Sequence, residues 1–104
     1  MTSATKPVAL VTGAARRIGR AIALDLAQAG WSIGLHYRSG GAEAEALARE
    51  IANLGVSVVP LACDLAEPAD LATLLPRCTS AIGAPSCLVN NASVFEFDSL
   101  TTLR

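Results

Sequence analysis

The sequence predicts an α/β fold built on a parallel sheet, because short apolar segments typical of strands alternate with amphipathic segments typical of helices. The segments follow the order β-α-β-α-β-α-β, which requires parallel pairing through right-handed crossovers. The expected strand order is 3-2-1-4, with a switch point between the first and fourth strands. Ligands of such sheets bind at the carboxyl ends of the strands beside that point. We expect residues 1–104 to be the N-terminal portion of one doubly wound domain.

The first half of the chain supplies two strands and a helix. Val8–Val11 is apolar throughout, as in a strand that is buried on both faces. Apolar residues then recur at steps of three and four, which predicts one apolar stripe along a helix: Ile18, Ile22, Leu26 and Ala29. Gly30 is expected to end this helix, and residues 31–37 form the second predicted strand.

In the second half, residues 42–54 predict a helix with Leu47, Ile51 and Leu54 on one face. Residues 56–62 predict a third strand, whose Pro60 suits an edge position because no ladder donor is needed there.

Two prolines frame the next helix. Pro68 suits the first helical position before residues 69–75, and Pro76 is expected to end or kink that helix and to begin another through Ile82. Residues 86–90 form the fourth predicted strand, whose apolar edge is one that a fifth strand would cover.

Composition excludes several classes of protein. Hydrophobic residues make up 52% of the chain, which is enough for a packed core. The net charge of −1 and the scattered basic residues argue against nucleic-acid binding, and no apolar run approaches the roughly 20 residues of a membrane helix. Cys63, Cys78 and Cys87 fit buried thiols of a reducing compartment rather than disulfides or metal ligands. We therefore expect a cytoplasmic protein without a metal site.

The turn from Thr12 to Gly19 follows the first strand and opens the first helix. Gly13 can adopt backbone angles denied to other residues, and Gly19 permits close packing of the helix on the sheet. The free N–H groups at the start of the helix would face a bound pyrophosphate. In the first crossover of a Rossmann-type sheet, such a turn indicates a dinucleotide site rather than a simple connection.

The end of the second strand indicates which dinucleotide binds. Folds that bind NAD place an acidic residue there to bond the ribose 2′-hydroxyl, but no acidic residue occurs between Trp31 and Ala42. Arg38 and Ser39 supply a charge and a hydroxyl instead, which favours the 2′-phosphate of NADP(H).

Three motifs resemble those of the short-chain dehydrogenase/reductase family. The segment from Thr12 to Gly19 resembles TGxxxGxG, Asn90–Asn91–Ala92 resembles NNAG, and Asp64–Leu65 resembles the family's adenine-contacting segment. Arg17 replaces the middle glycine and Ser93 replaces the last one, a combination similar to that of the pteridine reductase branch.

This resemblance implies site residues. Those expected to bind the cofactor are Gly13, Arg16, Arg17, Ile18, Gly19, His36, Tyr37, Arg38, Ser39, Asp64, Leu65, Asn91, Ala92 and Ser93. Arg17, Ser93 and Phe95 would bind the substrate, with Phe95 stacked on a flat pterin ring. The alternatives are a solvated Arg17 and a core Phe95. For His36, a structural or cofactor-lining role is favoured over general-base catalysis.

The family's reaction uses a Tyr-x-x-x-Lys pair, with the lysine lowering the pKa of the tyrosine. Tyr37 and Lys6 are the sole residues of their kinds here and cannot form that pair. We therefore expect no catalytic residue in this chain, which we interpret as a truncated and inactive part of a longer reductase.

The leading hypothesis is an NADPH-dependent reductase of a pterin-like substrate, and the resemblance implies a homo-oligomer, a tetramer, for the full-length protein. Reduction of 3-oxoacyl or other carbonyl substrates is one alternative. A non-catalytic dinucleotide-binding fragment is another.

Overall fold

The fold is a four-stranded parallel sheet with helices on both faces. A computed structural model describes residues 6–15 and 17–91. The strands are β1 (Val8–Val11), β2 (Ser32–Tyr37), β3 (Val58–Ala62) and β4 (Cys87–Val89), and their order in the sheet is β3-β2-β1-β4. The expected Rossmann-like fold and strand order are confirmed.

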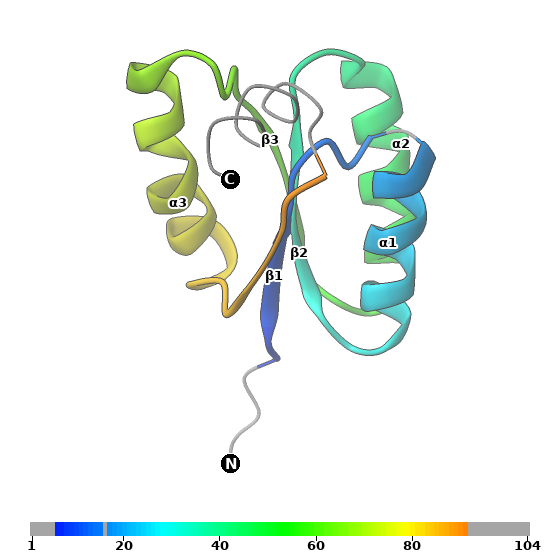
Figure 1. Ribbon diagram of the computed structural model, residues 1–104. Coiled ribbons are helices and arrows are strands. Elements are labelled where there is room, and N and C mark those ends of the chain that lie inside the picture. The colour runs from blue at the N-terminus through cyan, green and yellow to red at the C-terminus, as the bar shows by residue number, and fades with distance from the viewer. Residues whose placement is uncertain (1–5, 16, 92–104) are drawn as a thin grey trace, which may run out of the picture.

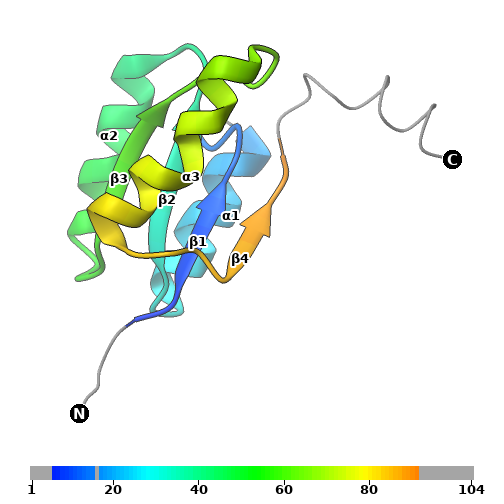
Figure 2. The same cartoon turned by 90° about the vertical axis from the view of Figure 1, so that its left-hand side faces the viewer.

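Three helices connect the strands. Figure 1 shows α1 (Arg17–Gln28) and α2 (Gly41–Ala52) on one face of the sheet and α3 (Pro68–Ile82) on the other. Seen from the side, β4 lies at the sheet edge beside β1 (Figure 2). Since every strand runs in the same direction, the turns that follow them meet at one edge of the sheet.

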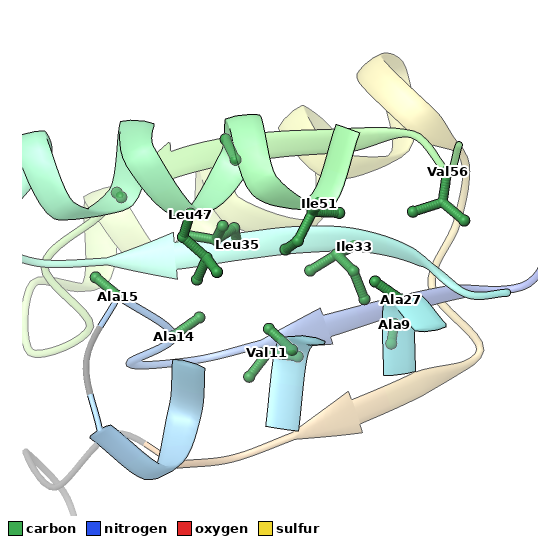
Figure 3. Packing of buried hydrophobic residues seen from close by; sticks show 13 residues of the cluster. Ala9, Val11, Ala14, Ala15, Ala27, Ile33, Leu35, Leu47, Ile51 and Val56 are labelled. Carbon is green, nitrogen blue, oxygen red and sulfur yellow. The ribbon is translucent and has the colours of Figure 1, made fainter. Parts of the chain in front are cut away.

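The strands are buried on both faces, as the unbroken apolar run in β1 predicts. Ala9 and Val11 pack toward α1 and α2, together with Ile33 and Leu35 of β2 (Figure 3). The intervening residues of β1 belong to a second cluster with α3, which includes Leu10, Leu74 and Cys78. The period of two along each strand therefore divides the core into two layers.

The apolar stripe expected along α1 is wrong in part, because Ile22 and Leu26 pack against the core but Ile18 and Ala29 are exposed. The buried residues of α1 are Gly19, Ala23 and Ala27, whereas Ile18 is 67% exposed. Small residues at steps of four let the helix axis lie close to the sheet, and the larger aliphatic residues flank this contact. The spacing of the apolar residues predicted the helix but not which of its faces contacts the sheet.

The end of α1 forms as predicted. Gly30 adopts a left-handed φ of 102°, and its N–H donates to the Ala27 carbonyl. The N–H of Trp31 donates to the Leu26 carbonyl, which completes a Schellman motif.

The two interior prolines behave differently from each other. Pro60 lies in β3, an edge strand of the described sheet, as expected. Pro76, however, lies inside one continuous helix from Pro68 to Ile82, so the expected helix end at Pro76 is wrong. Packing of Leu74 and Cys78, on either side of Pro76, holds α3 against the sheet despite the lost backbone hydrogen bond.

Element ends also differ slightly from expectation. The helix expected over residues 42–54 ends at Ala52, and Leu54 is 43% exposed rather than part of its buried face. Cys63 and Cys78 are buried as predicted, but Cys87 is only half-buried because β4 is an edge strand. None of the helices in the described part of the chain has the length and apolar character needed to cross a bilayer.

The edge of the sheet at β4 presents apolar surface. Leu88 is 64% exposed, and a groove of about 380 Å³ lies between α3 and β4, lined mainly by leucines such as Leu71 and Leu75. This agrees with the apolar edge expected from the sequence.

Close contact between α3 and β2 depends on Gly34. A β-carbon at this position would lie 2.8 Å from Cys78 Sγ and 3.0 Å from Leu10 Cδ1. We expect Gly34→Ala to destabilise the protein by about 1–3 kcal/mol, because the fully buried Cys78 thiol and the Leu10 side chain would have to shift. Urea unfolding of the full-length protein measures the effect.

A double-mutant cycle provides the control. Cys78→Ala removes the clashing sulfur, so Gly34→Ala should cost at least about 0.5 kcal/mol less in that background. Strictly additive effects of the two substitutions would show that the contact does not limit the approach of α3.

Candidate functional site

The turn after β1 has two residues with left-handed backbone angles. Gly13 has a φ of 61°, and Arg17, the first residue of α1, has a φ of 51°. The second value is unusual for a residue with a side chain, and it falls where the family signature has a glycine. The backbone at position 17 thus keeps a glycine-like conformation while carrying an exposed arginine.

Gly19 brings the first turn of α1 against the loop that precedes it. A β-carbon on Gly19 would lie 2.1 Å from the Gly13 carbonyl oxygen and 2.7 Å from Asn91 Nδ2. No rotamer change can relieve a clash with a backbone oxygen. The glycine is therefore a steric requirement of the turn, as the sequence motif predicts.

A hydrogen-bond network joins the turn to the end of β4. The Thr12 hydroxyl accepts from the Asn91 amide at 2.8 Å, and it lies 3.1 Å from Asn90 Oδ1 and 3.3 Å from the Val89 carbonyl, its two possible acceptors. Asn91 Nδ2 donates to the Gly13 carbonyl at 3.3 Å. Two segments nearly 80 residues apart in sequence therefore determine one loop conformation.

His36 lies beneath the turn rather than on its surface. The side chain is 2% exposed, and Nδ1 accepts a hydrogen bond from the Gly13 amide at 2.9 Å. Nε2 lies 2.8 Å from the Cys63 carbonyl, to which it donates. Burial, together with the positive charge of Arg77, lowers the pKa of His36, while the Cys63 bond opposes this shift.

Charged side chains lie beside the ends of β2 and β3. Arg38 Nε is 3.8 Å from Asp64 Oδ1, and both side chains are partly exposed. An exposed pair of this kind adds little stability. The Arg38–Asp64 pair matters because it holds a cation next to the loop that follows β3.

The loop after β3 is held by α3. The Asp64 amide donates to Asp70 Oδ2 at 2.8 Å, and Asp64 Oδ1 accepts from the Ala66 amide at 3.0 Å. The Arg77 guanidinium donates twice to the Ala62 carbonyl, at 2.7 and 3.1 Å. Burial is the main reason that the pKa of the Cys63 thiol is raised, so this thiol is protonated and unreactive at neutral pH.

The structure brings most of the predicted site residues to the edge where the strands end. The described ones are Gly13, Arg17, Ile18, Gly19, His36, Tyr37, Arg38, Ser39, Asp64, Leu65 and Asn91. Their exposure differs: Gly19, His36 and Leu65 are buried, whereas Arg17, Ile18, Arg38 and Ser39 are exposed. Arg16, Ala92, Ser93 and Phe95 lie outside the described residues.

Sequence reasoning did not assign the positioning roles of Thr12, Asp70 and Arg77. Thr12 was part of the motif, and Asp70 carried a usable signal, because an acidic residue in the first turn of a helix often accepts a nearby backbone N–H. The contact of Arg77 with a carbonyl 15 residues away has no local signature.

The match to a known family covers nearly all of these features. The family described as short chain dehydrogenase matches residues 7–103. The chain belongs to the short-chain dehydrogenase/reductase family. The glycine turn, the buried first strand and the asparagine segment after β4 are therefore parts of one family framework.

Curated relatives extend well beyond this chain. A 3-oxoacyl-[acyl-carrier-protein] reductase of Staphylococcus aureus is 37% identical over 96 residues, which are 92% of this chain and 39% of the relative. A short-chain type dehydrogenase/reductase of Picea abies is 41% identical over 95 residues, covering 86% of this chain and 35% of that protein. The chain thus spans less than two fifths of the length of these relatives.

Solved structures agree with the fold. The alternative dihydrofolate reductase FolM of Brucella suis, solved in complex with NADP, superimposes with a TM-score of 0.79 at 39% identity, over 86% of this chain and 37% of that one. A 3-oxoacyl-[acyl-carrier protein] reductase of Brucella melitensis gives 0.77 at 38% identity, over 86% and 35%.

Replacing Gly19 by alanine tests the steric requirement. We expect Gly19→Ala to destabilise the full-length protein by about 3 kcal/mol or more, because the Gly13 backbone must move. Thermal unfolding is the measurement. Gly41→Ala is the matched control, since Gly41 also lies in a first helical turn but a β-carbon there has no neighbour nearer than 3.9 Å. Equal stability of the two variants would contradict the close packing.

Proposed function

We propose that this chain forms the cofactor-binding part of an NADP(H)-dependent reductase. The observation that carries the proposal is the convergence of the glycine turn, the Arg38–Ser39 segment and the Asp64–Leu65 loop at one edge of the sheet. Each of the three matches the chemistry of a different part of the dinucleotide. Complexes of NADP with the Brucella suis protein, and with a putative dehydrogenase of Burkholderia cenocepacia that is 28% identical, support the choice of cofactor.

The pyrophosphate would lie at the start of α1. The first turn of this helix carries no acidic residue, so no carboxylate there would repel an anion at the positive end of the helix dipole. Gly19 lets the first turn of the helix lie directly against the Gly13 carbonyl, because a β-carbon there would clash with it. Asn91 would lie beside the nicotinamide end, together with Ala92 and Ser93, which follow it in sequence.

The adenosine end would extend across β2 toward β3. Arg38 and Ser39 are exposed at the end of β2, where a 2′-phosphate needs a cation and a hydroxyl. Asp64 and the backbone of Leu65 would contact the adenine, since the side chain of Leu65 is buried in the core beside α3. Tyr37, half-buried beside them, completes this side of the cofactor site.

The bound cofactor supplies a hydride for reduction. The residues of this chain bind and orient it, and neither Tyr37 nor Lys6 can provide the family's proton-donating pair. We therefore propose that the reaction requires residues outside these 104, and that the chain alone is inactive.

The proposed substrate is a pterin, and Arg17 is the main support for it. A left-handed backbone costs a residue with a side chain roughly 1 kcal/mol, so a glycine would suit position 17 better unless the guanidinium has a use. Paired hydrogen bonds from Arg17 to the cofactor and to a pterin would provide that use. By the family resemblance, Ser93 would line the junction of cofactor and substrate, and Phe95 would stack on the pterin ring. The likeness to a dihydrofolate reductase from Brucella suis agrees with this substrate class.

A second candidate is reduction of a 3-oxoacyl substrate. The Staphylococcus aureus and Brucella melitensis reductases favour it, because their identity to this chain is similar to that of the dihydrofolate reductase. A non-catalytic dinucleotide-binding fragment is the third candidate. For the full-length protein we propose a cytoplasmic homo-oligomer, a tetramer by family resemblance, with reduced thiols at Cys63 and Cys78.

Arg38 allows a test of cofactor choice. We expect Arg38→Gln to weaken NADPH binding by the full-length protein about 10- to 100-fold, because a charge-assisted bond to the 2′-phosphate is lost, and to leave NADH binding unchanged. Fluorescence titration with both cofactors measures this. Arg49→Gln, at the far end of α2, is the matched control. An equal loss for NADPH and NADH would assign Arg38 a structural role.

Arg17 allows a test of the substrate. We expect Arg17→Gly to leave the stability of the full-length protein within about 1 kcal/mol of the wild type, since glycine accepts the left-handed angle. The kcat/KM for NADPH-dependent reduction of a dihydropteridine should fall at least about tenfold, as expected for loss of paired hydrogen bonds. Activity on a 3-oxoacyl thioester, with none on the dihydropteridine, would instead favour the second candidate.

A further inference from the structure

The two ring nitrogens of His36 are both bonded to backbone groups whose roles cannot change. The Gly13 amide can only donate, so Nδ1, at 2.9 Å, must be unprotonated. The Cys63 carbonyl can only accept, so Nε2, at 2.8 Å, must carry the proton. The surroundings therefore select one neutral tautomer of a side chain that is 2% exposed.

These two backbone groups belong to different loops. Gly13 lies in the turn between β1 and α1, and Cys63 begins the connection between β3 and α3. Under the proposed function, the first loop binds the pyrophosphate and the second binds the adenine. The imidazole ring is thus a direct bridge between the two parts of the cofactor site.

We propose that His36 is a positioning residue that holds the pyrophosphate turn and the adenine loop at a fixed separation, and that only its neutral Nε2–H form does so. This inference rests on the proposed function, because the separation matters only if one dinucleotide spans both loops. It gives the ring a role beneath the cofactor, where both nitrogens are already engaged, rather than in contact with it.

The backbone of β2 reinforces the same arrangement. The His36 carbonyl accepts from the Ala14 amide at 2.9 Å, and the Tyr37 carbonyl accepts from the Cys63 amide at 3.0 Å. Each loop is therefore anchored to β2 by one backbone bond and to the His36 ring by another. Gly13, whose N–H has the ring nitrogen as its acceptor, is the point where loss of the ring would leave a donor unsatisfied.

Protonation would break the bridge at Gly13. A proton on Nδ1 would face the Gly13 N–H, so an acceptor would become a second donor. Burial lowers the pKa of His36 from 6.5, as does the positive charge of Arg77. The neutral form of the folded protein therefore persists below pH 6.5, and the bridge weakens only as the pH falls through the lowered pKa of His36.

The other titratable groups near the ring do not reverse the lowering of the His36 pKa. The nearby thiols, Cys63 and Cys78, have raised pKa values and are uncharged at neutral pH. Charged residues on the neighbouring elements include Arg17 at the start of α1, Arg38 after β2, Asp64 after β3, and Asp70 and Arg77 on α3, and of these it is the charge of Arg77 that lowers the pKa of His36.

Two substitutions separate hydrogen bonding from packing. Glutamine carries an acceptor and a donor on one amide and does not titrate, so His36→Gln should bind NADPH within about threefold of the wild type at pH 7.5. Leucine fills similar space without either function, and His36→Leu should bind at least about tenfold more weakly. Equal affinity of all three full-length proteins would overturn the inference.

The pH profile is the second readout. The 2′-phosphate of NADPH also titrates near pH 6, but it does so identically with either protein. Kd is therefore measured from pH 7.5 to 5.0 for the wild type and for His36→Gln, and their ratio is taken. Wild-type affinity should fall relative to the glutamine variant as the pH falls through the lowered pKa of His36, by at most tenfold per pH unit for one proton.

The outcomes distinguish the two proposals. A constant ratio of the two affinities down to a pH at which NMR shows His36 to be protonated would overturn the role of His36 while leaving NADPH binding intact. Failure of the wild type to bind NADPH at any pH would overturn the proposed function, and the inference with it. A ¹⁵N-histidine NMR spectrum, assigned by the signal missing from His36→Gln, should show the Nε2–H tautomer at pH 7.5, and the opposite tautomer would exclude the bridge.

Discussion

The carbonyl oxygen of Gly13 occupies the space that a β-carbon on Gly19 would need, and much of the site depends on this contact. It places the first turn of α1 directly against the loop, so that the helix start faces the edge of the sheet. The same closeness continues down the helix, where Ala23 and Ala27 are the residues that face the core. A larger residue at any of these positions would move the helix and its dipole away from the edge.

Around this contact, side chains act mostly on backbone groups. Thr12, Asn91 and His36 bond to the turn or its neighbours, and Asp70 and Arg77 bond to the loop and strand end at β3. Backbone groups and helix dipoles provide anion binding without a dedicated side chain. The exposed side chains of Arg17 and Arg38 are then available for the ligand contacts proposed for them, to a pterin and to the 2′-phosphate.

The sequence was sufficient to predict the fold class, the strand order and the end of α1 at Gly30, because these follow from local patterns. It misidentified the buried face of α1, since periodicity weighs large apolar residues and the helix–sheet contact required small ones. It also overstated the effect of Pro76, whose cost is offset by tertiary packing of α3. The bridging role of His36 depends on two loops that meet only in the folded chain.

The bonds between Thr12 and Asn91 also bear on the order in which the chain folds. The residues of the turn are synthesised nearly 80 residues before their hydrogen-bond partners. Closing so long a loop has an entropic cost, so we expect short-range structure to form first. A growing chain would therefore complete its β-α-β crossovers with an incompletely shaped turn, and a dinucleotide could act as a ligand only after β4 has joined β1.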